Sequence, residues 1–131
     1  MKKLPIIACV SAAMALQSAA FAGPHYNAFV SVYKSSTSSS AYGSMSSARY
    51  YSSDTNQYIG CNSAADLVSS IYISCTARDA SGSYLYCYSN TADGQARQAV
   101  SSVNSTSSIY FQVNSSGKCT YISIGNFSYN L

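Results

Sequence analysis

The sequence predicts an all-β protein, a small antiparallel β-sandwich or barrel built from hairpins and stapled by two disulfides. Ser, Tyr, Ile, Val and Thr dominate after residue 16, and this composition favours strands over helices. Turn residues recur between short apolar segments, which is typical of small sandwiches and barrels. Four cysteines lie beyond the N-terminal segment, an even number that indicates a disulfide framework in an exported protein.

Residues 1–22 predict a secretory signal peptide. A Lys-Lys pair precedes an almost uncharged apolar run at residues 4–16, and Ala-Phe-Ala at residues 20–22 places small residues where signal peptidase requires them. The run is shorter than the about 20 apolar residues that span a bilayer, and no later segment approaches that length, so we expect no membrane span. We therefore expect a secreted protein, extracellular or periplasmic, that begins at Gly23 after cleavage near Ala22.

The remaining chain is predicted to have two parts. Residues 23–47 contain an N-terminal strand at residues 26–33 and a Ser-rich stretch at residues 35–47, which we interpret as a flexible or extended linker that adds little to the core. Residues 48–131 form the disulfide-stabilised β-domain. An uncharged strand on a tether can complete its own sheet or join that of a neighbouring molecule. This arrangement resembles the exchangeable strand of secreted pilus subunits, although the four cysteines depart from that family, and it makes self-association a candidate property.

Two β-hairpins are predicted in the β-domain. Residues 69–78 lead into a turn at residues 79–82, and residues 107–113 lead into a turn at residues 114–117. In both turns an Asp or Asn comes first and a Gly last, which is typical of a type I turn closed by a left-handed residue. A short strand at residues 58–61 and a two-turn helix at residues 95–100 complete the predicted elements.

The register of the first hairpin assigns its side chains to two faces. A three-residue loop places Cys75 opposite Cys87. The core face then carries Ile71, Ile73, Cys75, Ala77, Leu85 and Cys87. The opposite face carries Tyr72, Tyr84, Tyr86 and Tyr88, with Ser74 and Thr76 between them.

The same reasoning applies to the second hairpin. It places Phe111 opposite Tyr121 and Val113 opposite Cys119. Ile109, Phe111 and Val113 are then expected to point into the core. Ile122 and Ile124 are expected on the reverse face, together with Tyr110.

The four cysteines that remain after export are Cys61, Cys75, Cys87 and Cys119. The predicted register favours a Cys75–Cys87 bridge between adjacent strands, which leaves Cys61 with Cys119. The main alternative is Cys61–Cys75 with Cys87–Cys119. Zinc binding is not expected, because no closely spaced cysteine pair occurs.

The residues needed for catalysis are scarce. His25 is the only histidine and lies two residues inside the expected mature terminus, where packed structure cannot hold it as a base. The four carboxylates, Asp54, Asp66, Asp79 and Asp93, all lie in turn-like contexts. No calcium loop, phosphate-binding loop, zinc helix or Gly-x-Ser-x-Gly elbow occurs. We therefore predict no enzymatic activity, no catalytic residues, no bound metal and no cofactor.

Charge and tyrosine content indicate the kind of partner. Without the signal peptide, five basic and four acidic residues remain, a net charge of +1 that argues against nucleic-acid binding. Tyrosine is abundant, with 13 residues, and the predicted tyrosine face could stack on sugars or pack against a protein. We expect an exported structural or binding protein of the cell surface or extracellular matrix, which binds polysaccharide or another extracellular protein. The alternative is a small secreted inhibitor or toxin that acts on a protein partner.

Overall fold

A computed structural model describes residues 26–66, 70–90 and 94–127, and the structural statements below refer to these residues. The predicted signal peptide, His25 and Asp93 lie outside them. The elements are β1 (Ser31–Lys34), β2 (Ser38–Ser44), the π-helix η1 (Ser47–Tyr51), β3 (Tyr58–Asp66), β4 (Ser70–Arg78), β5 (Tyr84–Ser89), α1 (Gly94–Ser101), β6 (Ser107–Asn114) and β7 (Cys119–Asn126).

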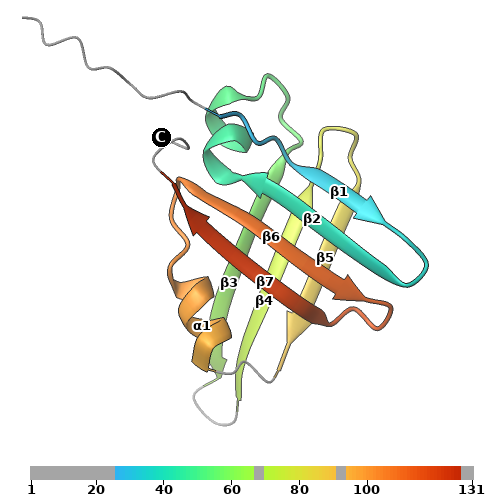
Figure 1. Ribbon diagram of the computed structural model, residues 1–131, viewed down its shortest axis with the longest axis vertical. Helices are drawn as coiled ribbons and strands as arrows, with labels where there is room; N and C mark the ends of the chain where they lie inside the picture. The colour runs from blue at the N-terminus through green and yellow to red at the C-terminus, as the bar shows by residue number, and fades with distance from the viewer. Residues whose placement is uncertain (1–25, 67–69, 91–93, 128–131) are drawn as a thin grey trace, which may run out of the picture.

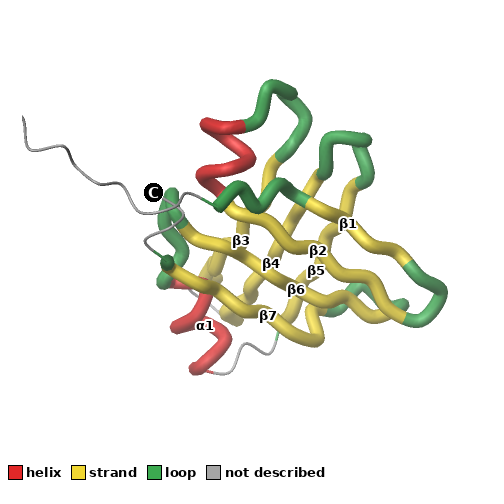
Figure 2. Tube along the Cα trace, turned by 45° about the horizontal axis from the view of Figure 1, so that its top comes forward, coloured by secondary structure: helices red, strands yellow, loops and turns green. Residues whose placement is uncertain are grey.

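The strands form two antiparallel sheets, which confirms the predicted fold class. One sheet has the order β1-β2-β6-β7 and the other has the order β3-β4-β5. Figure 1 shows the four-stranded sheet in front, with its strands crossing those of the three-stranded sheet behind it. Helix α1, predicted at residues 95–100, packs beside β3 and β7 on one side of the sandwich (Figure 2).

The core lies between the two sheets and follows the period of two in each strand. The predicted inward residues of β6 are buried, and so are the described inward residues of β4 and β5. The buried core cluster contains Val30, Ala41, Ala48, Ile59, Cys75, Ala77, Leu85, Cys87, Ile109, Phe111 and Val113. Phe111 is the largest side chain in the described part of the chain that is fully buried.

Both predicted hairpin turns are confirmed. Gly82 and Gly117 have φ angles of 88° and 78°, the left-handed region that glycine adopts without steric cost. In the first turn the Asp79 N–H donates to the Ser83 carbonyl at 3.0 Å, and the Gly82 N–H donates to the Asp79 carbonyl at 3.0 Å. Each turn therefore combines a type I turn with a left-handed closing residue.

The interpretation of residues 35–47 as a linker is wrong. Ser38–Ser44 form β2, which pairs with β1 on one side and with β6 on the other. Ala41 lies opposite Phe111, and both side chains are buried. Small side chains are required here, because a Cβ atom on Gly43 would lie 2.9 Å from Val30 Cγ2. The Ser-rich segment thus contributes to the core by allowing close approach rather than by supplying apolar bulk.

The strand predicted at residues 26–33 is shorter than expected. Strand β1 begins at Ser31 and pairs with β2 of the same chain. The preceding residues cross the end of β2, where the Ser44 N–H donates to the Ala28 carbonyl at 2.8 Å. The Val30 N–H donates to Gln57 Oε1 at 2.8 Å. These contacts bury Ala28 and Val30 without extending the sheet.

The register of the second hairpin differs from the predicted one because β7 contains a β-bulge. Val113 pairs with Cys119 as predicted, but Gln112 pairs with Tyr121, so that Thr120 is the extra residue. Phe111 therefore lies opposite Ile122 and not opposite Tyr121. The prediction that Ile122 and Ile124 occupy the reverse face is wrong for the same reason, because both pack against the core cluster.

The disulfides follow the alternative connectivity. Cys61 is bonded to Cys75 and Cys87 is bonded to Cys119, so the favoured Cys75–Cys87 bridge is wrong. The hairpin register that suggested it is nevertheless correct, since Cys75 lies opposite Cys87. The sequence did not reveal that β3 extends to Asp66 and pairs with β4. Since β4 lies between β3 and β5, Cys75 has Cys61 as a second cross-strand neighbour. Two disulfides indicate an oxidising environment.

Candidate functional site

The outer face of the three-stranded sheet is the candidate site. In β5, Tyr84, Tyr86 and Tyr88 are exposed whereas Leu85 and Cys87 are buried, as expected for a half-buried strand. Tyr72 of β4 is also exposed. The structure therefore places all four tyrosines of the predicted surface on the outside of this sheet.

The pairing of β3 with β4 adds a third strand to this surface. One row across the sheet contains Tyr58, Arg78 and Tyr84, and the next contains Gly60, Thr76 and Tyr86. We call the whole surface the three-strand face. It consists of Tyr58, Gly60, Asn62, Ala64, Tyr72, Ser74, Thr76, Arg78, Tyr84, Tyr86 and Tyr88.

Small and polar side chains form the floor of the three-strand face, and tyrosines border it along β5 and at its two ends. A Cβ atom on Gly60 would meet no other atom within 4 Å, so the floor is open at this point. The Ser74 hydroxyl donates to Asn62 Oδ1 at 2.7 Å. The hydroxyl and amide groups of the floor can form hydrogen bonds beside the tyrosine rings.

Ring contacts order one side of this face. The rings of Tyr86 and Tyr88 are stacked, with centroids 6.4 Å apart and an angle of 21° between their planes. Lys118 Nζ lies 3.8 Å from the centroid of the Tyr88 ring, which is the geometry of a cation–π contact. Tyr84 and Tyr86 are 47% and 46% exposed, so both remain accessible to a ligand.

Tyr58 is a member of the three-strand face that the sequence prediction missed. The sequence predicts only a short strand at residues 58–61 and assigns it no partner. The continuing alternation of Tyr58, Gly60, Asn62 and Ala64 is the signal that could have extended it. Tyr58 also lines a cleft of about 300 Å³ at the edge of β3, together with Met45, Ala48, Arg49, Tyr50, Gln57, Ile59 and Ser105. No carboxylate lines this cleft.

Asp54 has a structural role. The Gln57 amide and the Ser52 hydroxyl both donate to Asp54 Oδ2, and the Asn56 N–H donates to Oδ1 at 2.7 Å. The Gln57 and Ser52 side chains hold the pKa of Asp54 well below its ordinary value of 3.8. Gln57 in turn accepts the Val30 N–H, so this cluster fastens the N-terminal segment to the loop before β3.

Asp79 has a similar role in the first hairpin. Partial desolvation raises the pKa of Asp79, but hydrogen bonds from the Ser81 hydroxyl and the Ser83 N–H outweigh it and lower the pKa. These bonds measure 2.6 Å and 2.9 Å. The predicted turn roles of Asp54 and Asp79 are therefore confirmed, whereas Asp66 is the last residue of β3.

These pKa shifts predict acid sensitivity. A carboxylate with a lowered pKa in the folded protein contributes its full stability above the ordinary pKa, and this contribution is lost as the pH falls through the folded value. We expect the melting temperature to decrease below about pH 4. The double variant Asp54→Asn/Asp79→Asn should be less stable at neutral pH and should show a shallower decrease on acidification. Thermal unfolding followed by circular dichroism between about pH 2 and 7 measures both effects. An equally steep decrease in the variant would contradict the assignment.

Among the described residues, no group of three or more His, Cys, Asp or Glu side chains could hold a metal ion. No helix in the described part of the chain is long and apolar enough to cross a membrane. No protein-family model, curated protein or solved structure matches this chain.

Proposed function

We propose that this protein is an exported, non-enzymatic binding module that holds a polysaccharide on its three-strand face. The observation that supports this function best is the row of exposed tyrosines on β5, with Tyr58 and Tyr72 at the two ends of the face, beside a floor of small polar side chains. A tyrosine ring offers apolar area for the C–H groups of a sugar, and its hydroxyl offers a hydrogen bond.

The shape and composition of the face suit an extended polysaccharide. Ala64 is the only aliphatic side chain among the eleven residues of the three-strand face, so almost all of the apolar area on the face is tyrosine ring. The hydroxyl and amide groups of the floor can replace the water around sugar hydroxyls. An extended chain can lie across three strands without entering a cavity.

Export is the second part of the proposal. The Lys-Lys pair, the apolar run and the Ala-Phe-Ala sequence support cleavage by signal peptidase near Ala22, and the two disulfides fit an oxidising destination. A structural or binding role at the cell surface or in the extracellular matrix follows from export and from polysaccharide binding.

Substitution on the three-strand face tests this function. The variant Tyr84→Ser/Tyr86→Ser should weaken polysaccharide binding about tenfold or more, because two adjacent stacking surfaces are lost. Affinity electrophoresis through gels that contain single polysaccharides measures the retardation of each variant. Tyr26→Ser is the control, since Tyr26 is 70% exposed and lies before β1, outside both sheets.

Two results would contradict the proposal. One is equal retardation of the double variant and the Tyr26→Ser control. The other is the absence of retardation by any polysaccharide together with capture of one stoichiometric protein, which would support the secreted inhibitor or toxin instead.

A further inference from the structure

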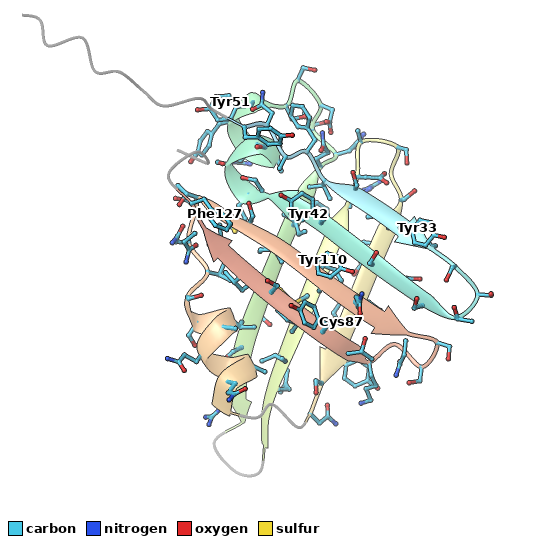
Figure 3. The ribbon with its side chains drawn as sticks, in the orientation of Figure 1. Tyr33, Tyr42, Tyr51, Cys87, Tyr110 and Phe127 are labelled. Atoms are coloured by element: carbon cyan, nitrogen blue, oxygen red, sulfur yellow. A yellow bond between two sulfur atoms is a disulfide. The ribbon has the colours of Figure 1, made fainter. Side chains whose placement is uncertain are left out.

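The outer face of the four-stranded sheet carries a second group of tyrosines. We call this surface the four-strand face. It consists of Ser31, Tyr33, Ser38, Ser40, Tyr42, Tyr110, Gln112, Asn114, Tyr121 and Ser123. Figure 3 shows Tyr33, Tyr42 and Tyr110 on the sheet that faces the viewer.

The register gives the four-strand face an ordered pattern. One row across the sheet reads Ser31, Tyr42, Tyr110 and Ser123, and the next reads Tyr33, Ser40, Gln112 and Tyr121. Two tyrosines thus occupy the centre of one row and two occupy the ends of the other. Small serines lie beside the rings and leave their faces accessible, and Tyr33, Tyr42 and Tyr121 are all exposed.

Contacts within the four-strand face hold the side chains of Tyr110, Gln112 and Tyr121 in place. The Tyr110 and Tyr121 rings meet edge to face, with centroids 5.8 Å apart and an angle of 60°. The Gln112 amide donates to the Tyr110 hydroxyl at 2.6 Å. Tyr33 and Tyr42 take part in no ring contact that the structure describes, so their rings are available to a ligand.

The absence of charge on this face selects the ligand. All ten residues of the four-strand face are Ser, Tyr, Gln or Asn. A charged ligand would lose its hydration here without gaining an opposite charge. Aromatic rings interspersed with hydroxyls and amides instead match the C–H groups and hydroxyls of an uncharged sugar chain.

We propose that the four-strand face is a second binding site, specific for uncharged polysaccharide, and that the protein bridges two polysaccharide chains. Bridging rests on the proposed function of the three-strand face, which lies on the opposite side of the sandwich (Figure 1). Because the core separates the two faces, one straight segment of polysaccharide cannot occupy both. Each protein molecule therefore connects two segments, and binding is strengthened by multivalency.

The test compares variants of each face. The four-strand variant is Tyr33→Ser/Tyr42→Ser, the three-strand variant is Tyr84→Ser/Tyr86→Ser, and a third variant combines both pairs. Tyr26→Ser is again the control. Retardation is measured in gels that contain galactomannan, hydroxyethyl cellulose or dextran, with polygalacturonate as the charged comparator. Bridging is measured as the increase in light scattering when protein is added to the same dissolved polysaccharides.

We expect wild-type protein and the control to be retarded and to increase scattering. Each single-face variant should lose the scattering increase and bind about tenfold more weakly. The combined variant should lose both the retardation in the gels and the increase in light scattering. Circular dichroism checks that the variants are folded, and Tyr33→Phe/Tyr42→Phe, which keeps both rings, should retain bridging.

Several results would overturn the inference. If the four-strand variant still bridges chains while the three-strand variant loses retardation, the second site is wrong and the proposed function stands. If only the four-strand variant loses retardation, the proposed function and bridging both fail, and the four-strand site alone remains. Retardation by polygalacturonate alone contradicts an uncharged ligand. Dimerisation without polysaccharide that is lost in the four-strand variant would identify a second copy of the chain as the occupant.

Discussion

Replacing Phe111 with alanine is expected to lower the free energy of unfolding by about 3–5 kcal/mol, the range for removing a buried aromatic ring. Phe111 is 0% exposed and lies in β6 between Ala41 of β2 and Ile122 of β7. Because Ala41 is itself small, it cannot extend into the space that the ring leaves. We therefore expect a persistent cavity and a loss near the upper end of this range.

Urea denaturation of the Phe111→Ala variant measures this loss. The matched control is Tyr121→Ala, which removes an aromatic ring from the neighbouring strand of the same sheet. Tyr121 is 54% exposed on the outer face, so its replacement should cost less than about 1 kcal/mol. Similar unfolding midpoints for the two variants would show that Phe111 does not lie in the core.

Removing the Cys87–Cys119 disulfide is expected to cost about 4 kcal/mol on the chain-entropy model, against about 3 kcal/mol for Cys61–Cys75. The first bridge spans 32 residues and the second spans 14. The two bridges also differ in what they join. Cys87–Cys119 connects β5 with β7 and hence one sheet with the other, whereas Cys61–Cys75 connects strands that already pair. Both differences make the first removal more destabilising.

The double variants Cys87→Ser/Cys119→Ser and Cys61→Ser/Cys75→Ser test this order. Each leaves the other pair of cysteines intact, so the two proteins are matched controls for one another. Urea denaturation gives the two losses, and peptide mapping without reduction identifies the bridges in the unmodified protein. A Cys75–Cys87 bridge in the map, or a larger loss from removing Cys61–Cys75, would contradict the structure.

Local sequence patterns were sufficient to define the two hairpins of this protein. Asp79 and Gly82 define one hairpin turn, and Asn114 and Gly117 define the other, because each pair supplies a turn-opening side chain and a left-handed glycine within four residues. Once the first turn is placed, the period of two assigns the neighbouring side chains to the core or to the outer surface. The predicted tyrosines of the three-strand face therefore lie together outside the sheet.

How the strands combine into sheets depends on pairings between distant segments. The pairing of β2 with β6 joins residues about 70 positions apart. No local pattern in a Ser-rich segment indicates which distant strand it pairs with. The pairing of β3 with β4 likewise gave Cys75 a neighbour on each side, so that the hairpin register could not select its disulfide partner. The extra residue at Thr120 reversed the faces of the strand that follows. The four-strand face depends on the β2 pairing and on this bulge, because they bring tyrosines from β1, β2, β6 and β7 to one surface.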